Sequence, residues 1–396
     1  MEPTRAIQLH QQYKGKLFTG LKVPLDSLDD MKVYYTPGVA DPCLLIAEEE
    51  GVAIATGVAN GTRVNKETEA LYSCTIKNNT VAVVTDGSAV LGLGNIGPRA
   101  GLPVMEGKCA LFKKFGGVDA FPICLDTQDT DEIVRAVKLI APVFGGINLE
   151  DISAPRCFEV ERRLQEELDI PVFHDDQHGT AVVVLAGLYN ALKVVGKDLA
   201  DVKIAISGSG AAGIAICDLL LAAGAVDVIL VDSKGAIVEG RADMNDEKVA
   251  FAKRTNPRKV SGSLADAMRG ADVVIGVSKA GAITGEMVKG MCTGPIVLAM
   301  ANPTPEIMPD VAKAAGAAVV ATGRSDYPNQ LNNVLVFPGI FRGALDHRVN
   351  VVTIAMQIGA ARNLAALVAE PSADKIIPGV FESGVCEAVA SAVVKA

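Results

Sequence analysis

A strand, a glycine-rich turn and a helix follow one another near the middle of the chain, and this order constrains the fold more than any other segment. The predicted strand Lys203–Ser207 runs directly into the sequence Gly208-Ser209-Gly210-Ala211-Ala212-Gly213. An apolar helix follows to about Ala223, and a second strand, Asp227–Val231, ends in Asp232. Glycines with this spacing let a pyrophosphate approach the backbone amides of a helix N-terminus, and the acid can bind ribose hydroxyls. The segment predicts a Rossmann-type dinucleotide-binding domain built on a doubly wound parallel sheet.

Three later apolar runs fit the same sheet, at residues 272–276, 296–299 and 317–321. Ser278 and Asn302 follow the first two of them, and the carboxyl ends of parallel strands line the ligand crevice of such a sheet. Another strand is expected after the paired amides Asn332 and Asn333. The nucleotide itself stays open between NAD and NADP. Asp232 favours NAD slightly, because its charge repels a 2′-phosphate, but Ser233-Lys234 and Arg241 offer groups that could neutralise that phosphate.

Two strand ends in the first half of the chain each deliver a pair of acidic residues. The apolar strand Ile170–Phe173 runs into His174-Asp175-Asp176, and an apolar stretch around Ile147 ends in Glu150-Asp151. Adjacent carboxylates repel one another, so they need a cation, a hydrogen-bond network or solvent to compensate them. A solvated turn with a helix N-cap is the alternative for one pair alone. Two converging pairs favour a metal site with oxygen ligands.

The same half of the chain holds its own α/β pattern. Strands are expected at 81–85, 120–125 and 144–151, and helices at 130–141 and 156–168. Gly92, Gly94 and Gly97 repeat the Gly-x-Gly-x-x-Gly spacing, but residues 98–103 are not expected to build the apolar helix that a nucleotide site requires, so tight turns are predicted there.

Two further side chains are candidates for chemistry. Lys108 stands in an apolar helical stretch, where burial is expected to lower the pKa of its amine towards neutrality. Snorkelling to solvent is the alternative for this lysine. Tyr35 precedes Thr-Pro-Gly, which favours an extended or turn conformation.

Composition excludes several classes of protein. A net charge of −9 argues against a nucleic-acid partner. The 49% of hydrophobic residues contain no charge-free run long enough to span a bilayer. Eight cysteines are scattered without any Cys-x-x-Cys, which is typical of reduced core thiols. The first residues lack the pattern of a signal peptide, so a soluble, cytoplasmic enzyme is expected.

Taken in order, seven motifs resemble those of malic enzymes in their shorter bacterial form, and the resemblance covers nearly the whole chain. They are Tyr-Thr-Pro-Gly-Val-Ala at 35–40, Leu-Gly-Leu-Gly-Asn-Ile-Gly at 91–97, Pro-Val-Met-Glu-Gly-Lys at 103–108, Asn-Leu-Glu-Asp at 148–151, Phe-His-Asp-Asp-Gln-His-Gly-Thr-Ala at 173–181, Ala-Asn-Pro-Thr at 301–304 and Asn-Asn-Val at 332–334.

This resemblance implies roles for particular side chains. Tyr35 would be the general acid and Lys108 the general base, with Asp175 beside it. Glu150, Asp151 and Asp176 would bind Mg²⁺ or Mn²⁺, hard cations that prefer oxygen ligands. Asn302 and Asn333 would hold the substrate. Larger family members carry an arginine where this chain has Ala89, so Arg63, Lys77 and Arg99 are the candidates to replace it at the substrate carboxylate.

The implied reaction is oxidative decarboxylation of (S)-malate to pyruvate and CO₂ with reduction of NAD(P). Two alternatives stay open: a malolactic enzyme, which would retain NADH and reduce pyruvate to lactate, and a catalytically silent dinucleotide-binding regulatory protein. The expected domains are a substrate and metal domain at 1–196, a dinucleotide domain at 197–345, and C-terminal helices at 346–396 that pack back on the first domain. A homodimer is expected, with neither nucleic acid nor membrane as a partner.

Overall fold

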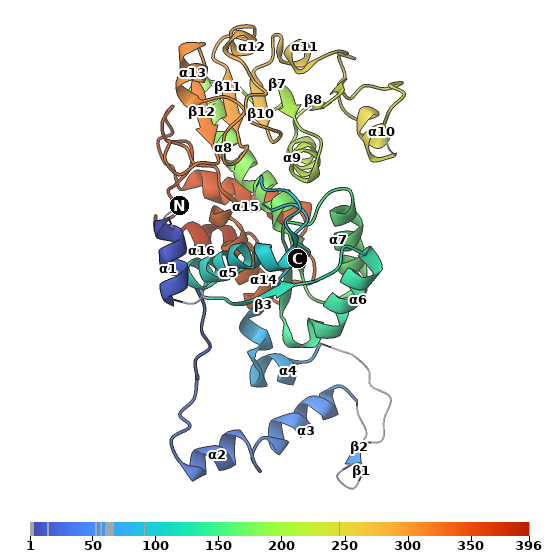
Figure 1. The fold of residues 1–396 in the computed structure, drawn as a ribbon, viewed down its shortest axis with the longest axis vertical. Coiled ribbons are helices and arrows are strands. Elements are labelled where there is room, and N and C mark those ends of the chain that lie inside the picture. The colour runs from blue at the N-terminus through green and yellow to red at the C-terminus, as the bar shows by residue number, and fades with distance from the viewer. Residues whose placement is uncertain are drawn as a thin grey trace.

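The computed structural model describes residues 4–13, 16–51, 54–55, 58–59, 67–90, 92–244 and 246–395. Two sheets, one parallel and one mainly parallel, lie one above the other along the long axis of the molecule, and an N-terminal arm projects from one end (Figure 1).

The first sheet has four parallel strands in the order β4-β3-β5-β6. Side chains of a strand point to alternate faces, and β3 shows this directly. Val81 and Val83 pack on one face with α5, whereas Ala82 and Val84 pack on the other with α6 and α7. Both faces are therefore covered. The elements are β3 (Thr80–Thr85), β4 (Asp119–Cys124), β5 (Gly146–Leu149), β6 (Val172–His174), α5 (Gly97–Gly116), α6 (Thr130–Ile140) and α7 (Arg156–Glu167).

The second sheet has six strands in the order β12-β11-β10-β7-β8-β9, all parallel except β9, which pairs antiparallel with β8. Ile204 and Ile206 of β7 face one side and Ala205 the other. The strands are β7 (Lys203–Ser207), β8 (Asp227–Asp232), β9 (Gly235–Ala236), β10 (Val273–Gly276), β11 (Ile296–Ala299) and β12 (Val319–Thr322). The helices are α9 (Ala211–Ala222), α10 (Asp246–Ala252), α11 (Leu264–Met268), α12 (Gly285–Lys289) and α13 (Pro309–Ala314). The predicted Rossmann-type sheet is confirmed.

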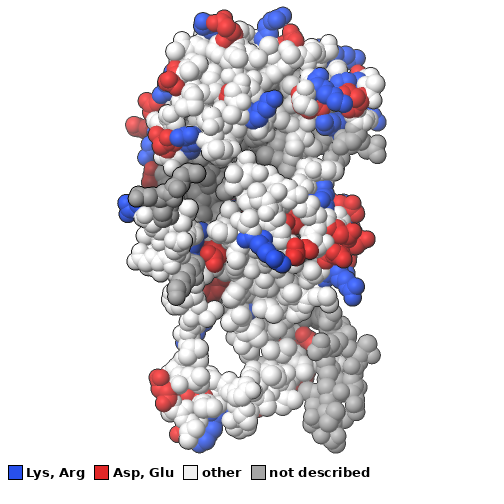
Figure 2. Space-filling model, viewed as in Figure 1, with Lys and Arg blue, Asp and Glu red and all other residues white. Residues whose placement is uncertain are grey.

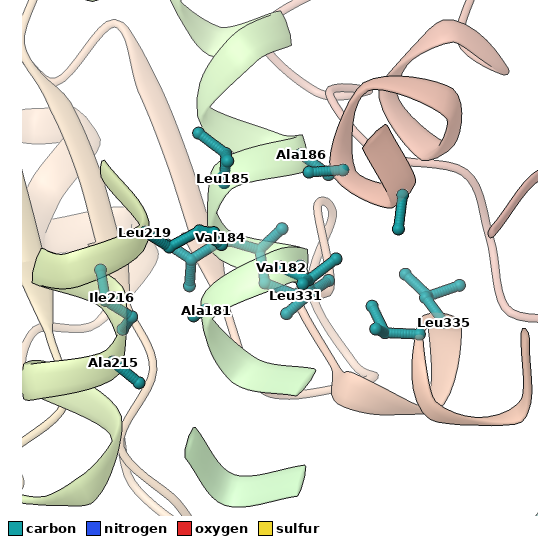
Figure 3. Packing of buried hydrophobic residues seen from close by; sticks show 14 of the residues in the cluster. Ala181, Val182, Val184, Leu185, Ala186, Ala215, Ile216, Leu219, Leu331 and Leu335 are labelled. Carbon is teal, nitrogen blue, oxygen red and sulfur yellow. The ribbon is translucent and has the colours of Figure 1, made fainter. Parts of the chain in front are cut away.

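Helix α8 (Thr180–Val195) links the two sheets, and most of its side chains are buried. Figure 3 shows Val182, Val184 and Leu185 of this helix among apolar side chains of α9 and of the segment that holds Leu331 and Leu335. One continuous apolar cluster includes Val83 of the first sheet, α8 and Ile206 of the second sheet. The two halves of the chain therefore share a core.

The C-terminal part forms α14 (Phe337–Asp346), α15 (Ile354–Ala366) and α16 (Val385–Ala390). Helix α14 packs on α5 through rings, with 4.6 Å between the centroids of Phe112 and Phe337 and 5.3 Å between those of Phe112 and Phe341. The strand expected after Asn333 is wrong, since α14 begins there after a short turn of 3₁₀ helix. The apolar run at 334–337 is buried on all sides, and a short run of this kind does not distinguish strand from helix. The predicted domain limits stay a prediction.

Helix α5 also differs from expectation, because it begins at Gly97 and includes residues 98–103. Pro98 lies in the first turn, where a missing N–H costs no intrahelical bond. Pro103 lies inside the helix and is tolerated there. Gly92, Gly94 and Gly97 have φ of 74°, 77° and 80°, so the predicted tight turns are confirmed even though a helix follows them.

The N-terminal segments lie largely outside this body. Helices α2 (Leu28–Tyr34) and α3 (Ala40–Glu49) form the projecting arm, and neither has a buried residue (Figure 1). Near them lie β1 (Ile54–Ala55), β2 (Val58–Ala59) and α4 (Glu69–Cys74), while α1 (Arg5–Tyr13) lies against the body. Apolar side chains of the arm are exposed, among them Leu28 at 75% and Val33 at 61%.

Surface and membrane properties follow from these elements. On the face shown in Figure 2, acidic side chains gather over α6 and α7, and elsewhere both signs of charge are interspersed. Within the described residues, one helical segment, Asp175–Val195, is apolar and long enough to cross a membrane, yet 67% of its 18-residue window is buried in the protein. Such burial is what a core helix has. All eight cysteines are free thiols.

Candidate active site

Acidic side chains converge at the carboxyl edge of the first sheet. Glu150 and Asp151 follow β5, and Asp176 lies in a wide helical turn, Asp175–Gly179, that connects β6 to α8. One ligand oxygen from each of Glu150, Asp151 and Asp176 lies within 4.8 Å of the other two. The Asp151 N–H donates to Asp176 Oδ2 at 2.8 Å, which ties the two strand ends together. The two acidic pairs predicted to converge do so.

Lys108 reaches this cluster from α5. Its amine lies 2.9 Å from Glu150 Oε1 and makes a short contact with Asp175 Oδ2, and its side chain is only 7% exposed. The expected lowering of its pKa is wrong. Burial does push the pKa of Lys108 down, but the attraction of Asp175 and Glu150 outweighs it, so that the pKa is raised. The amine also lies 4.1 Å from the ring centroid of Phe337, a distance at which a cation is attracted to the ring face.

The pKa values of the neighbouring carboxyl groups are raised as well. Burial raises the pKa of Glu150, and the neighbouring Asp176 carboxylate adds to the rise, although Lys108 opposes it. Burial likewise raises the pKa of Asp175 to about 7, against the attraction of Lys108. Four carboxylates, those of Glu150, Asp151, Asp175 and Asp176, lie close together at this edge, and a divalent cation would stabilise their combined negative charge. An all-oxygen donor set suits Mg²⁺ or Mn²⁺, and these residues fit such an ion.

A buried glutamate behind the cluster was not predicted. Glu161 of α7 accepts from the His174 N–H at 2.8 Å, from Gln177 Nε2 at 3.0 Å and from His178 Nε2 at 3.0 Å. It therefore holds the turn that carries Asp175 and Asp176. Burial would raise the pKa of Glu161, but the His178 ring beside it keeps that pKa below its usual value. Its position on one face of an ordinary amphipathic helix gives no sequence signal.

A second unpredicted network surrounds the loop after β3. Arg156 donates to Asp86 Oδ2 at 2.6 Å, to Ser88 Oγ at 2.9 Å and to Ser153 Oγ at 3.2 Å. Asp86 is fully buried, so this pair joins the ends of β3 and α7 within the low-dielectric edge of the sheet. The network braces the loop that carries Ala89, whose N–H donates to the Asp151 carbonyl at 2.9 Å.

The glycine-rich turn of the second sheet opens on a cavity of about 770 Å³. Of the predicted cofactor residues, Gly208, Ser209, Gly210, Asp232, Ser233, Lys234 and Ser278 line it. Gly210 has open space where a side chain would stand, at the N-terminus of α9. At Gly213, by contrast, a Cβ atom would lie 2.0 Å from the Gly208 carbonyl oxygen, so this glycine permits the turn to pack on the helix. Ala211 and Ala212 form the first turn of α9 without lining the cavity.

A second unpredicted glutamate fixes the loops beside this cavity. The fully buried carboxylate of Glu306 accepts from the Ser278 N–H at 2.7 Å and from the Ala301 N–H at 3.0 Å. It thus joins the loops after β10 and β11. Asn302 follows Ala301 and meets the first half of the chain, because a Cβ at Gly92 would lie only 2.4 Å from its carbonyl oxygen. Asn333 approaches the acidic turn, with its Cβ 3.3 Å from where a Gly179 side chain would begin.

Other predicted residues are not brought to the acidic cluster. Tyr35 follows α2 on the projecting arm and is 68% exposed (Figure 1). Lys77 is buried before β3, at the amino edge of the sheet, where it donates to the Phe144 carbonyl at 2.7 Å. Arg99 has a 92% exposed side chain beside Asp126. Arg63 lies outside the described residues. Lys77 is therefore wrong as a partner of the substrate carboxylate.

A Rossmann-type sheet beside a buried lysine–carboxylate centre defines a dinucleotide-dependent oxidoreductase. Comparison with known proteins makes the assignment specific. The description "Malic enzyme, N-terminal domain" matches residues 15–165, and "Malic enzyme, NAD binding domain" matches residues 177–396. The chain belongs to the malic enzyme family, whose members are NAD(P)-dependent, decarboxylating oxidoreductases.

Three relatives show how closely the chain follows that family. It is 56% identical over 394 residues to the bifunctional malic/malolactic enzyme of Bacillus subtilis, covering 99% of this chain and 92% of the relative. It is 57% identical over 384 residues to the NAD-dependent malic enzyme of Geobacillus stearothermophilus, covering 96% and 76%. The crystal structure of the NAD-dependent malic enzyme of Thermotoga maritima superposes with a TM-score of 0.91 at 46% identity, covering 99% of both chains.

Proposed function

We propose that the protein converts (S)-malate to pyruvate and CO₂ while reducing NAD or NADP, with Mg²⁺ or Mn²⁺ bound at the acidic cluster. The observation that carries this proposal is the position of Lys108. Its buried amine contacts Asp175 and Glu150 at the rim of three carboxylates that suit a hard divalent cation. A hydroxy acid bound at this edge of the sheet would have the buried Lys108 amine available to take its hydroxyl proton.

The residues of the chain divide the proton transfers between them. Lys108 accepts the C2 hydroxyl proton as the C2 hydride leaves, and Asp175 is the adjacent acceptor for the proton that the amine carries beforehand. Glu150, Asp151 and Asp176 would hold a divalent cation, which would supply Lewis-acid stabilisation of the negative charge that develops on the substrate oxygen. After the C3–C4 bond breaks and CO₂ departs, the Tyr35 hydroxyl gives a proton to C3. Asn333 orients the substrate beside the acidic turn.

One assay tests the reaction directly. Malate, Mn²⁺ and each nucleotide are mixed with the protein, and reduced nucleotide, pyruvate and CO₂ are measured together. We expect all three to form in equal amounts. A protein that only binds dinucleotide would give no signal with either nucleotide, which would contradict the proposal.

A malolactic reaction is the second candidate, because the Bacillus subtilis relative carries both activities in its name. The same site would then keep the reduced nucleotide and return its hydride to pyruvate, giving lactate. Lactate is measured in the same reaction. Lactate without accumulated reduced nucleotide would favour the malolactic reaction, and pyruvate with accumulated reduced nucleotide would exclude it as the main activity.

We further propose that a second copy of the chain completes the site. Tyr35 lies on an arm with no buried residues, away from Lys108 in the same chain (Figure 1). The exposed Leu28, Val33 and Leu44 give that arm apolar surface to bury against a neighbour. Mixing Tyr35→Phe and Lys108→Ala proteins, each nearly inactive, tests this. Restored activity in the mixture supports a shared site, whereas a monomer in sedimentation at micromolar concentration would contradict it.

A further inference from the structure

A fully buried carboxylate joins two loops at the carboxyl edge of the second sheet. Glu306 Oε1 accepts from the Ser278 N–H, 2.7 Å away, and Oε2 accepts from the Ala301 N–H, 3.0 Å away. The residue has no exposed surface. Gly276, the last residue of β10, leaves room for this carboxylate, because a Cβ there would overlap the Glu306 carboxyl carbon. One side chain therefore sets how far apart the loops after β10 and β11 lie.

The loop after β10 packs directly on the glycine-rich turn. Ser278 Oγ lies 2.9 Å from Oγ of Ser207, the last residue of β7. A Cβ at Gly208 would lie 2.5 Å from the Val277 carbonyl oxygen, so the two backbones are in close contact there. A displacement of Ser278 would therefore be transmitted to the glycine-rich turn.

The loop after β11 instead meets the first half of the chain. Asn302, which is expected to hold the substrate, follows Ala301, and its carbonyl oxygen packs on Gly92. Its amide nitrogen lies 2.9 Å from where a Cβ of Gly323 would stand, so the side chain packs on the loop after β12. These contacts bound the segment 301–302 on two sides, and Glu306 holds it from a third.

Hydride transfer needs the nicotinamide carbon and C2 of the substrate to lie about 3–3.5 Å apart. In the proposed reaction the nucleotide lies on the side of the glycine-rich turn and the substrate on the side of Asn302. We infer that Glu306 is a positioning residue for hydride transfer, because it keeps the loops after β10 and β11 at the separation that aligns the two reactants. The inference deepens the proposed function and rests on it. Glu306 takes no part in the proton transfers assigned to Lys108 and Tyr35.

Glu306→Gln tests this role because it keeps the size of the side chain. Both oxygens of Glu306 accept from backbone N–H groups, which cannot turn to become acceptors. The NH₂ group of glutamine must therefore face the N–H of Ser278 or that of Ala301, and one of the two loops shifts. A shift of about 1 Å in the alignment of reactants can cost roughly 10²-fold in rate, so we expect hydride transfer to slow roughly ten- to a hundredfold.

The rate constant of hydride transfer is measured in a single turnover. Full-length protein with Mn²⁺ is mixed in excess over the nucleotide with saturating malate, and nucleotide reduction is followed with ordinary malate and with malate deuterated at C2. We expect Glu306→Gln to lower the rate constant, and deuterium to lower it further. A loss of folded protein alone would leave the rate constant unchanged, because at saturating enzyme and malate it does not depend on the concentration of active enzyme.

Decarboxylation of oxaloacetate with Mn²⁺ is the second measurement. Oxaloacetate already has its keto group, so its conversion to pyruvate needs the acidic cluster but no hydride transfer. We expect the maximal rate of this reaction per folded protein to change less than about threefold in Glu306→Gln. An equal loss of both reactions would overturn the inference, because it would show a general loss of the site.

Asp272→Asn is the matched control. Asp272 is a buried carboxylate at the opposite edge of the same sheet, where it accepts from the Lys203 N–H at 2.9 Å and from Lys197 Nζ at 2.6 Å. It thereby joins the beginnings of β7 and β10. Its substitution should lower the free energy of unfolding and leave the single-turnover rate constant unchanged. An equal decrease of that rate constant in Asp272→Asn would overturn the inference.

Glu306→Asp is the second variant, and it serves if the glutamine variant does not fold. It keeps the charge but is one methylene shorter, so it cannot hold both loops at their present separation and should slow the same step. A wild-type rate constant in either folded Glu306 variant would overturn the inference while malate oxidation itself stands. A wild-type protein that oxidises no malate would instead contradict the proposed function, and the inference with it.

Discussion

Replacing Glu161 with glutamine tests whether the buried glutamate behind the acidic cluster sets the geometry of the cluster. Glu161 Oε2 accepts from both Gln177 and His178 at 3.0 Å, and Oε1 accepts from the His174 N–H at 2.8 Å. Glutamine keeps one acceptor oxygen and places an NH₂ group at the other position. If the NH₂ group takes the Oε1 position it faces the His174 N–H, another donor; if it takes the Oε2 position, the Gln177 amide must turn and the His178 ring must present an acceptor. Either change disturbs the contacts that hold the turn with Asp175 and Asp176.

The size of the effect follows from these contacts. The His178–Glu161 bond involves a charged group and is worth about 1.5–3 kcal/mol, so Glu161→Gln should lower the free energy of unfolding by roughly 2 kcal/mol. Groups that hold metal ligands in place typically change metal affinity by about ten- to a hundredfold when they are replaced. We therefore expect Mn²⁺ to bind the Glu161→Gln protein that much more weakly, with no direct ligand removed.

Mn²⁺ titration followed by electron paramagnetic resonance measures the affinity, and denaturant unfolding measures the stability. Glu159→Gln is the matched control, because Glu159 is on the same helix, its side chain is 56% exposed and its partner Arg163 lies 3.6 Å away. An exposed pair of this kind contributes little. Mn²⁺ affinity within about twofold of wild type in the Glu161→Gln protein would refute the positioning role.

Four further substitutions examine the site and its surroundings. Asp176→Asn should fold normally but require at least about tenfold more Mn²⁺ for half-maximal activity, since a neutral group replaces one of three anions; wild-type dependence would exclude Asp176 as a ligand. Lys108→Ala should lower kcat with malate by roughly 10²-fold or more, whereas Tyr35→Phe should still reduce oxaloacetate, which needs no proton at C3; a normal kcat in Lys108→Ala would contradict the base. Lys77→Met should lower the free energy of unfolding by about 1–3 kcal/mol and leave kcat unchanged, because the buried amine that donates to the Ala141 and Phe144 carbonyls and pairs with the partly exposed Glu67 is lost far from the cluster; loss of kcat in folded protein would place Lys77 in the site.

The strands and the acidic edge were predictable because their patterns are local. Buried parallel strands give continuous apolar runs, and the residue that follows each run must lie at the carboxyl edge of the sheet. The pattern predicts that the acidic pairs Glu150-Asp151 and Asp175-Asp176 converge, and the short distances among Glu150, Asp151 and Asp176 agree with it. The glycine-rich turn was equally predictable from the sequence, since a side chain at Gly208 or Gly213 would clash with the backbone and Gly210 leaves open space at the helix N-terminus.

The predictions that were wrong, and the residues that were not predicted, depend on contacts between segments distant in sequence. The pKa of Lys108 is governed by Asp175 and Glu150, which come from two other elements, and no local pattern reports their approach. Glu161 and Glu306 act through backbone N–H groups that only the folded chain brings to them. The apolar run after Asn333 is compatible with a strand or a helix. In the structure it leads into helix α14, which packs on α5.

The single apolar cluster that runs through α8 bears on how far the two halves of the molecule can be exchanged between relatives. Val83 of one sheet and Ile206 of the other belong to this cluster, so the two halves of the chain do not have separate hydrophobic cores. A chimera that takes its nucleotide-binding half from another member of the family must therefore also take the side chains of α8, α9 and α15 that interlock with it.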